Sequence, residues 1–551
     1  MKKSHKLLIL SVLFLSTFPA YAQSLYNGGH IPQQVEWYKT GLMPGTPTTA
    51  DHVINVITWG ADPTGQTNSI NAINNAINYA KGKSGLKVIY FPAGHYKFLS
   101  PIILTASDNE SNIVFRGEGS STILQFSVGN QNNCFKITGS LGATPYTVNS
   151  SISKGTNQIF VSNLDNDFDP NDWIWLYEYS FPGIETGFIP CVGQVTQLTT
   201  VYQHSGIIKD KASKFYSTNN SLKVRKIVPI TNVGIENLHI ERIEPDDSNT
   251  GSNVWFIDAV NCWIKAVESE KTCKHHVEIR RCSHIYVSGS YFHDANSYET
   301  GGRGYGTCIE ISSTNCLIEN NIFRHLRHAM LVQGGANCNV LTYNYSFDQH
   351  WTKYGVPFSG VWPGADLSLH GNYPYSNLFE HNITEKIWAD DFHGENGPYN
   401  AIVRNATEED EERTRIKLEN APNTSVLGCE ISNFQFIAIL ISGTTSIDLD
   451  LYGKYMTSPS QSYDYADAVE HGIGVGAPYM QLKDYSYYYS QKPSFLSSYY
   501  SFPTIGPGYF FSTSNDIPAK GRYSTGTKTY ASGLTQLPPL AVSNISIIIR
   551  L

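Results

Sequence analysis

The residues best suited to chemistry lie in two similar stretches of the chain, 23 residues apart. The stretch SLHGNYPYSNLFEHNITE occupies residues 368–385, and DFHGENGPYNAIVRNATE begins at residue 391. Each stretch contains a His-Gly pair, with the histidines at His370 and His393. Histidine is the side chain that most readily gains and loses a proton near neutral pH. Two histidines at equivalent positions of a repeat therefore suggest a site of proton transfer.

Aligning the repeats on their turn residues predicts which other side chains share the face of these histidines. The turn residues are Asn377, Asn400 and Thr424, and Lys417 falls at the histidine position of the third repeat. The positions two and four residues earlier hold Ser368, Asp391 and Arg415, and then Asp366, Ala389 and Arg413. Because alternate residues of a strand face the same side, the sequences DLSLH, ADDFH and RTRIK are expected side by side.

The candidate site combines this face with its borders. Aligning the preceding repeat on Asn339 places Arg327 and His328 at one edge, and a neighbouring loop carries aromatic side chains suited to stacking on sugars. The predicted catalytic residues are His370, His393, Asp366, Asp391 and Lys417. The predicted substrate-binding residues are Arg415, Arg327, His328, Arg413, Tyr373 and Trp362.

This arrangement could support two kinds of acid-base chemistry. Neighbouring strands lie about 4.8 Å apart, so His370 and His393 should nearly touch, which would keep at least one of them neutral and able to act as a base. Asp366 and Asp391 are predicted to lie roughly 8 Å apart, which suits an inverting pair of carboxylates. Asp390 is predicted to point inward. No cofactor is required, although Asp366 and Asp391 could together hold a calcium ion.

The elements that must position these groups are short strands. Segments of the form Asn, apolar, x, apolar, x, Asn recur at spacings of 21 to 24 residues wherever no loop intervenes. They begin at Asn232, Asn261, His284, Asn315, Asn339, Asn377, Asn400, Thr424 and Thr445. Alternation with a period of two indicates strands, and about 23 residues is enough for one coil of three short strands. The sequence therefore predicts an all-β solenoid, a right-handed parallel β-helix with laddered asparagines.

The start of the chain resembles a known group of proteins. GADPTG at residues 60–65, a helical pattern over residues 68–80 and FPAG at residues 91–94 are similar to the opening of pectate-lyase-superfamily β-helix proteins. The resemblance implies a parallel β-helix whose open end is covered by an N-terminal capping helix. It spans roughly residues 53 to 450, and it leaves the reaction open because lyases, hydrolases, epimerases and phage tailspikes share the fold.

One functional hypothesis is β-elimination on a polysaccharide or oligosaccharide that contains uronic acid. Such a reaction needs a cation at the carboxylate, a base for the C5 proton and an acid for the leaving oxygen at C4. Arg415 and Lys417 are suited to the first role, and either histidine of the repeat to the second. Tyr373 or the other histidine would be the acid. The leaving group would be a sugar or water.

Two other hypotheses stay open. The order Asp366, Asp390-Asp391, His393-Gly394 and Arg415-Ile416-Lys417 resembles polygalacturonase-type hydrolases, and this resemblance implies that the aspartates catalyse hydrolysis. Alternatively, the chain is a glycan-binding β-helix protein without catalytic activity. In each case the expected partner is a glycan, and an acidic one for the two enzymatic hypotheses.

Composition limits the location and the partners of the protein. The basic start MKKSHK, a short apolar run and the A-x-A pattern at Ala20 and Ala22 predict a signal peptide at residues 1–22 and a secreted or periplasmic protein. An N-terminal extension at 23–52, the β-helix at 53–455 and a Tyr-rich segment packed on it at 456–551 would follow. A net charge of -8 and an aromatic content of 13% argue against a nucleic-acid partner, and the only long apolar run is the one near the start, which argues against a membrane protein. A monomer or a homotrimer is expected.

Overall fold

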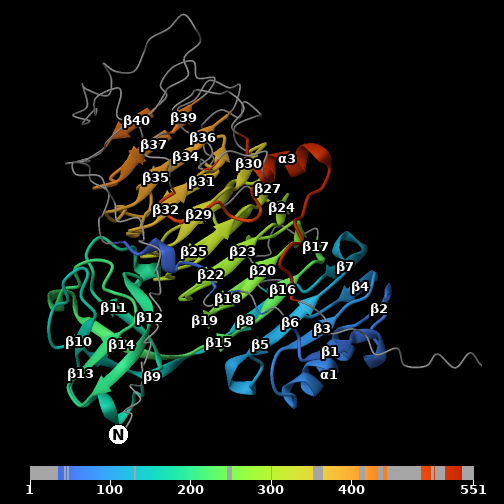
Figure 1. The fold of residues 1–551 in the computed structure, drawn as a ribbon, viewed down its shortest axis with the longest axis horizontal. Helices are drawn as coiled ribbons and strands as arrows, with labels where there is room; N and C mark the ends of the chain where they lie inside the picture. Colours follow the sequence, from blue (N-terminus) through green and yellow to red (C-terminus); the bar gives the residue numbers. More distant parts are fainter. Residues whose placement is uncertain are drawn as a thin grey trace, which may run out of the picture.

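The protein is a parallel β-helix with one inserted lobe (Figure 1). The structure is a computed structural model and describes residues 35–42, 45, 47, 49–129, 132–244, 251–298, 301–350, 364–408, 416–427, 429–431, 439–442, 486–497, 502 and 516–535. The predicted signal peptide therefore lies outside the described residues. No helix among the described residues is long and apolar enough to cross a membrane.

Three long sheets, whose strands all pair in parallel, run the length of the solenoid. The first sheet contains β1 (His52–Asn55), β3 (Lys87–Tyr90), β6 (Ile113–Arg116), β16 (Gly234–Glu236), β20 (Trp263–Lys265), β23 (Tyr286–Ser288), β26 (Leu317–Glu319), β29 (Val340–Thr342), β32 (Leu378–Glu380), β35 (Ala401–Val403) and β38 (Ser425–Leu427). The second contains β2 (Thr64–Asn68), β4 (Gly94–Phe98), β7 (Thr122–Phe126), β17 (His239–Arg242), β21 (Glu268–Glu270), β24 (Tyr291–His293), β27 (Ile322–Arg324), β30 (Tyr345–Phe347), β33 (Ile383–Thr384), β36 (Ala406–Thr407) and β39 (Glu430–Ile431). The third contains β5 (Ile102–Thr105), β8 (Phe135–Thr138), β18 (Val254–Ile257), β22 (His275–Arg280), β25 (Tyr305–Glu310), β28 (His328–Val332), β31 (Leu367–His370), β34 (Ile387–Asp390), β37 (Ile416–Glu419) and β40 (Ile439–Ser442).

The coil of three short strands predicted from the repeat is therefore confirmed. Each repeat places one apolar side chain at the same position of the first sheet, and these side chains stack into a buried column. The column contains Ile235, Ile264, Val287, Ile318, Leu341, Phe379 and Ile402, all fully buried. Burial of this kind stabilises the solenoid by removing apolar surface from water along its whole length.

Buried asparagines connect successive coils. In one ladder the amide Nδ2 of Asn321, Asn344 and Asn382 each donates to Oδ1 of the next asparagine at 2.9–3.0 Å, ending at Asn405. A second ladder joins Asn339, Asn377 and Asn400 in the same way at 3.0 and 3.1 Å. The ladders predicted from the sequence are present. Each side-chain amide provides a hydrogen-bond partner for the next asparagine, whose polar atoms would otherwise be buried without one.

The helix expected over residues 68–80 is present as α1 (Ile70–Lys81). One face of α1 is polar and exposed, and the other buries Ile70, Ile73 and Ile77 in the same core cluster as the first coils. Short 3-10 helices are η1 (Trp37–Lys39), η2 (Val56–Trp59), η3 (Ala106–Asp108), η4 (Gly119–Ser121), η5 (Leu164–Asn166), η6 (Thr186–Phe188) and η7 (Thr218–Asn220).

Residues 140–228, within the range 53–455 predicted as the β-helix domain, form an inserted lobe outside the solenoid. They form an antiparallel sheet of β9 (Ser140–Thr147), β10 (Gln158–Phe160), β11 (Trp173–Glu178), β12 (Gly193–Tyr202), β13 (Ser205–Ile208) and β14 (Leu222–Val228), which is the blue-green lobe in Figure 1. This lobe has its own apolar core, which includes Leu164, Ile174 and Leu198. Because β6 pairs directly with β16, the chain leaves the solenoid for the lobe and then resumes the next coil. The small pair β15 (Ile230–Thr231) and β19 (Ala259–Val260) follows.

The described residues beyond position 485 lie against the solenoid. Ser486 Oγ donates to Glu380 Oε2 at 2.6 Å, and the Tyr487 backbone N–H donates to Oε1 of the same carboxyl at 2.9 Å. The helix α3 (Pro518–Thr525) is held by Arg522, whose guanidinium donates to Asn320 Oδ1 at 2.5 Å. Glu380 is fully buried, and this burial raises its pKa from 4.5 to about 7.

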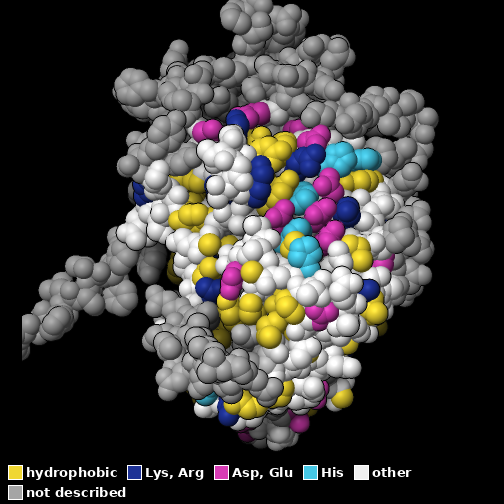
Figure 2. Space-filling model, turned by 90° about the vertical axis from the view of Figure 1, so that its right-hand side faces the viewer, with side chains coloured by type: hydrophobic (Ala, Val, Ile, Leu, Met, Phe, Trp, Pro, Cys, Tyr) yellow, Lys and Arg dark blue, Asp and Glu magenta, His cyan; other side chains and the backbone are white. Residues whose placement is uncertain are grey.

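A polar surface formed by ion pairs covers part of the second sheet. Figure 2 shows histidine, acidic and basic side chains gathered on this side of the molecule. His293 lies 3.2 Å from Glu268 and 2.8 Å from Asp294, and Arg324 lies 3.5 Å from Asp348. Acidic groups alternate with cations and histidines here, so they can offset one another's charge.

Breaking an asparagine ladder should destabilise the solenoid. We expect Asn382→Ala to lower the free energy of unfolding by about 1–3 kcal/mol, because the amide of Asn344 loses its buried acceptor. Thermal or denaturant unfolding of the purified protein would measure the change. The matched control is Asn74→Ala on the exposed face of α1, which should leave stability almost unchanged. Equal effects of both substitutions would contradict the role of the ladder.

The raised pKa of Glu380 predicts a pH dependence of stability. The folded state keeps this proton up to about pH 7, whereas the unfolded state loses it near pH 4.5. Stability should therefore fall as pH rises through this window, by up to about 3 kcal/mol from this one group. We expect the difference in unfolding free energy between wild type and Glu380→Gln to shift in favour of the variant from pH 4.5 to pH 7. A difference in unfolding free energy that does not vary with pH would contradict a raised pKa of Glu380.

Candidate active site

The candidate site lies on the outer face of the third sheet, where β31, β34 and β37 are neighbours. Leu367 pairs with Ile387 and His370 pairs with Asp390, so these strands are offset by 20 residues rather than the predicted 23. The turn after β31 has seven residues before the first sheet resumes, and the turn after β34 has ten. The alignment on turn asparagines holds for the first sheet, but the three extra residues shift the third.

The corrected alignment brings together a buried histidine and a buried aspartate. His370 Nδ1 lies 2.6 Å from Asp390 Oδ2, and the Phe392 backbone N–H donates to Asp390 Oδ1 at 3.2 Å. Asp390 is 1% exposed and His370 is 8% exposed. Leu369 and Ala389, which precede this pair, are in the core, so Asp390 faces outward and not inward as predicted. With Nδ1 bonded to the carboxylate, Nε2 is the ring nitrogen able to exchange a proton with a substrate.

Two further histidines flank His370. The ring centroids of His370 and His393 lie 4.7 Å apart, so the predicted close approach is observed, although His393 reaches this place from the turn after β34. His393 Nδ1 lies 2.8 Å from Glu185 Oε2 of the inserted lobe. The ring of His328 lies 5.2 Å from His370 on another side. Three imidazoles from three coils therefore meet at one place.

His328 is held neutral by its surroundings. It is fully buried, and burial together with the neighbouring His370 lowers its pKa well below the usual value. Its Nδ1 lies 2.8 Å from Ser368 Oγ, while its Nε2 has no hydrogen-bond partner among the described residues. A buried ring nitrogen without a partner is costly, which is typical of sites that receive a ligand.

Two cations in the region of the His370–Asp390 pair, called the dyad below, each lie over an aromatic ring. Arg327 is 3% exposed and lies over the ring of Tyr305 at 5.8 Å, and burial lowers the pKa of Arg327. Lys417 lies over the ring of Trp388 at 4.6 Å, while its Nζ is 2.7 Å from Glu419 Oε1. Lys417 aligns with Trp388 and Ser368 in the sheet rather than with the two histidines. Its predicted position in the histidine row is therefore corrected.

Asp366 and Asp391 do not form the predicted pair. Asp366 is 1% exposed, and it accepts hydrogen bonds from Ser346 Oγ at 2.5 Å and from the backbone N–H groups of Glu385 and Lys386 at 3.0 and 2.9 Å. Burial raises its pKa. Asp391 is exposed and bonds to Asn420. Their positions differ by five residues along the sheet, or roughly 17 Å. This spacing fits neither an inverting acid and base nor a shared calcium site.

The remaining predicted residues fall outside the dyad. Tyr373 packs against Phe181 of the lobe with ring centroids 4.5 Å apart, and burial raises the pKa of Tyr373. Arg413, Arg415 and Trp362 lie outside the described residues. Within the part of the chain that the structure describes, no group of three or more His, Cys, Asp or Glu side chains is arranged to hold a metal ion.

A continuous polar row connects the dyad to earlier coils. In the third sheet Arg280 pairs with Glu310 and His370 pairs with Asp390, while Gln333 and Glu419 each follow the last paired residue of their strand and continue the same row. Gln333 Nε2 donates to Glu310 Oε2 at 2.9 Å, and Arg280 lies 3.3 Å from Glu310 Oε1. The sequence analysis named Asp390 but gave it an inward direction, and it missed Trp388 and Glu185. Asp390 faces outward because the turn after β34 is longer than the turn after β31. The contact of Glu185 with His393 arises only because the lobe folds against the solenoid.

Comparisons with known proteins agree with this fold. Residues 53–201 match the family model described as "Rhamnogalacturonase A/epimerase, pectate lyase-like". The resemblance to pectate-lyase-like β-helix proteins is thereby confirmed. The matched residues include α1 and much of the lobe, and they end before the histidine site begins. No curated protein matches the chain.

Two solved structures share the fold at low sequence identity. One is the gp49 tailspike of Pseudomonas phage LKA1, with a TM-score of 0.51, 16% identity, and coverage of 73% of this chain and 75% of the other. The second is the Gp54 tailspike of Acinetobacter baumannii bacteriophage AP22, in complex with capsular saccharide, with a TM-score of 0.50, 14% identity, and coverage of 74% and 68%. At this identity the likeness establishes the β-helix.

Substitution of the adjacent residues Asp390 and Asp391 can test the observed strand alignment against the predicted one. For any acid-base reaction at His370, we expect Asp390→Asn to lower kcat between about 10²-fold and 10⁴-fold, because His370 loses its charged partner. Asp391→Asn, one residue further along the chain, should change kcat little. Steady-state kinetics would measure both, with thermal unfolding as a check on folding. A large loss with Asp391→Asn alone would favour the alignment based on turns.

Proposed function

We propose that the protein is a secreted carbohydrate-active lyase that performs β-elimination on a glycan containing uronic acid. The observation that carries this proposal is the buried Asp390–His370 dyad with His393 at 4.7 Å. Elimination needs a positioned base and a positioned acid close together, and two imidazoles can take these roles. The family description, which names rhamnogalacturonase, epimerase and pectate lyase, supports a carbohydrate substrate.

In the proposed reaction His370 Nε2 removes the proton from C5 of the uronate. The electron pair of the broken C–H bond forms the C4=C5 double bond, and the C4–O bond breaks. His393, in its protonated form, gives a proton to the departing oxygen. A sugar hydroxyl leaves from within a chain, and water leaves from a chain terminus. Both protons are accounted for by the two histidines, so the proposed reaction needs no cofactor.

The cations of the site have a role in this reaction. Removing the C5 proton places negative charge next to the carboxylate, and a cation at that carboxylate stabilises the charge that develops. Arg327 lies over the ring of Tyr305 and Lys417 over the ring of Trp388, and both rings are buried. Exclusion of water strengthens such electrostatic interactions. We propose that Arg327 and Lys417 bind the carboxylate of the uronate.

Hydrolysis by Asp366 and Asp391 is not supported, because those carboxylates are far apart and Asp366 is committed to internal hydrogen bonds. Epimerisation at C5 would begin with the same proton removal and differ in returning a proton to the opposite face. The word epimerase in the family description favours it as the second candidate. We further propose secretion directed by residues 1–22, and action as a monomer or homotrimer.

The test is incubation of the mature protein with a panel of uronic-acid polysaccharides and their oligosaccharides. We expect the ultraviolet absorbance of the unsaturated uronate to rise with time. His370→Asn should reduce the rate by about 10²-fold to 10⁴-fold. The matched control is His95→Asn, an exposed histidine in the first coils, which should keep full activity.

The other outcomes separate the alternatives. New reducing ends without absorbance would mean hydrolysis, and exchange of the C5 hydrogen with solvent without either signal would mean epimerisation. Absorbance without new reducing ends would mean loss of water from a chain terminus. Binding without any reaction would contradict a catalytic role and favour a glycan-binding protein.

A further inference from the structure

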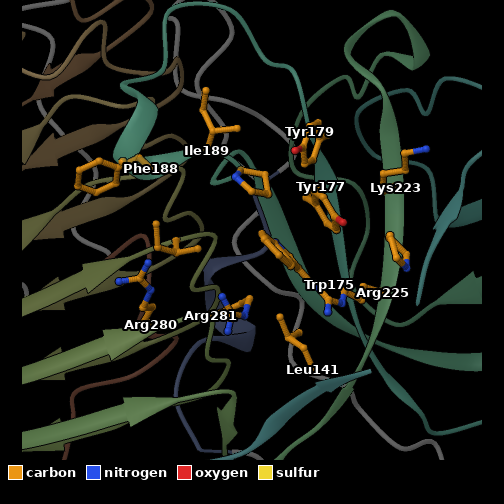
Figure 3. Close-up of a pocket in the computed structure, with 14 residues that line it drawn as sticks. Leu141, Trp175, Tyr177, Tyr179, Phe188, Ile189, Lys223, Arg225, Arg280 and Arg281 are labelled. Atoms are coloured by element: carbon orange, nitrogen blue, oxygen red, sulfur yellow. The ribbon is translucent and has the colours of Figure 1, made fainter. Parts of the chain in front are cut away.

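A cavity lies between the inserted lobe and the solenoid, close to the candidate active site. Its volume is about 410 Å³, within the usual size of a small-ligand pocket. The lobe contributes β9, β11, β14, η6 and the segment after η6, and the solenoid contributes the end of β22 and the residues that follow β22 and β25. Figure 3 shows aromatic and basic side chains lining this space.

The cavity is positively charged. Lys223, Arg225, Arg280 and Arg281 line it, and none of its 14 lining residues is acidic. Arg281 is neutralised by Asp258, at 2.7 and 2.9 Å, and Arg280 lies 3.3 Å from Glu310. Among the described residues, no carboxylate pairs with the other two cations.

Arg225 and Lys223 bond to neutral oxygens. Arg225 Nε donates to the carbonyl oxygen of Gly142 at 2.5 Å, and Lys223 Nζ donates to Thr147 Oγ1 at 2.9 Å. These bonds hold the two side chains in place without cancelling their charge. A preorganised pair of cations at a partly enclosed surface favours an anionic ligand.

The aromatic side chains give this cavity the character of a sugar site. Trp175 and Tyr177 are stacked with ring centroids 4.0 Å apart, and Tyr179 beside them is 54% exposed. Burial raises the pKa of Tyr177, so its hydroxyl stays protonated and able to donate. Rings with an apolar face and a polar edge suit a ligand that has both apolar C–H faces and hydroxyls.

One buried polar group in the cavity has no partner. Trp175 is 3% exposed, and its indole N–H has no hydrogen-bond acceptor among the described residues. A buried donor without an acceptor costs about 1–3 kcal/mol. The nitrogen itself is out of contact with solvent, so a ligand oxygen would reach it only after a local rearrangement.

The cavity and the dyad belong to one surface. Phe188 lines the cavity, and its ring centroid lies 6.2 Å from that of His393. Arg280 is in the same row as His370, three strands away, a distance of about 14 Å. An oligosaccharide, rather than a single sugar unit, would reach from one to the other.

We propose that this cavity binds a carboxylate-bearing sugar unit of the same glycan, away from the bond that reacts. Tyr179, which is exposed, would contact the sugar ring beside the buried stack of Trp175 and Tyr177, and Arg225 with Lys223 would bind its carboxylate. This inference deepens the proposed function and rests on it for the class of substrate. It makes the lobe a determinant of acidic-glycan specificity.

The test is a binding titration with oligosaccharides of galacturonate, guluronate and mannuronate in the His370→Asn background. We expect at least one acidic oligosaccharide to bind, and the pair Lys223→Gln and Arg225→Gln to weaken its affinity at least tenfold. The methyl ester of that oligosaccharide should bind more weakly and be insensitive to the pair. The matched control is Lys226→Gln, on the same strand but outside the cavity, which should bind as the parent does.

Kinetics with wild-type His370 separate the two proposals. The pair should raise KM for long substrates and leave kcat and the turnover of the shortest substrate unchanged, with an unchanged melting temperature. Three results would overturn the cavity proposal: unaltered affinity and KM in the Lys223→Gln and Arg225→Gln variant, equal binding of the methyl ester, or no binding of any acidic oligosaccharide. In each case a gain of absorbance with the wild-type protein would still support elimination. Binding that depends on the cavity, without turnover by wild type, would overturn the proposed reaction and keep the cavity.

Discussion

The parallel alignment of one coil on the next is the constraint on which the rest of this molecule depends. Buried strands need every polar group satisfied, and the asparagine ladders provide this between coils while the apolar column fills the interior. An asparagine one residue out of register would lose both its donor and its acceptor. From β16 to β39 the turns between the first and second sheets are therefore uniform, with two residues in each, and variation among these coils is confined to the other connections.

That variation creates the site. The three additional residues after β34 leave the asparagines of the first sheet aligned, but they change the register between β31 and β34 in the third sheet. Asp390 therefore lies beside His370. The same longer turn carries His393 back toward the dyad. A small insertion that leaves the ladder intact can thus assemble buried ionisable groups from separate coils. Burial then sets their chemistry, as the lowered pKa of His328 illustrates.

The inserted lobe adds what a bare solenoid lacks. The outer face of a β-helix is shallow, and a wall beside it makes a cleft that can enclose part of a polymer. Glu185 and Phe188 from the lobe reach His393, while Trp175 and Arg225 face the solenoid across the cavity (Figure 3). The wall and the reacting groups therefore come from parts of the chain about 200 residues apart and are joined only by the fold.

The sequence by itself determined the coil, because its signals are local. Alternating apolar residues and asparagines spaced by one coil predict the strands and their ladders, and the repeated His-Gly predicts that His370 and His393 meet. Only the tertiary structure decided which carboxylate accompanies them. The position of Asp390 depends on the length of a turn, the burial of Asp366 depends on backbone groups of another coil, and the lobe depends on antiparallel pairing over long separations. A one-residue change of register reverses the direction of a side chain, so strand pattern alone cannot fix these choices.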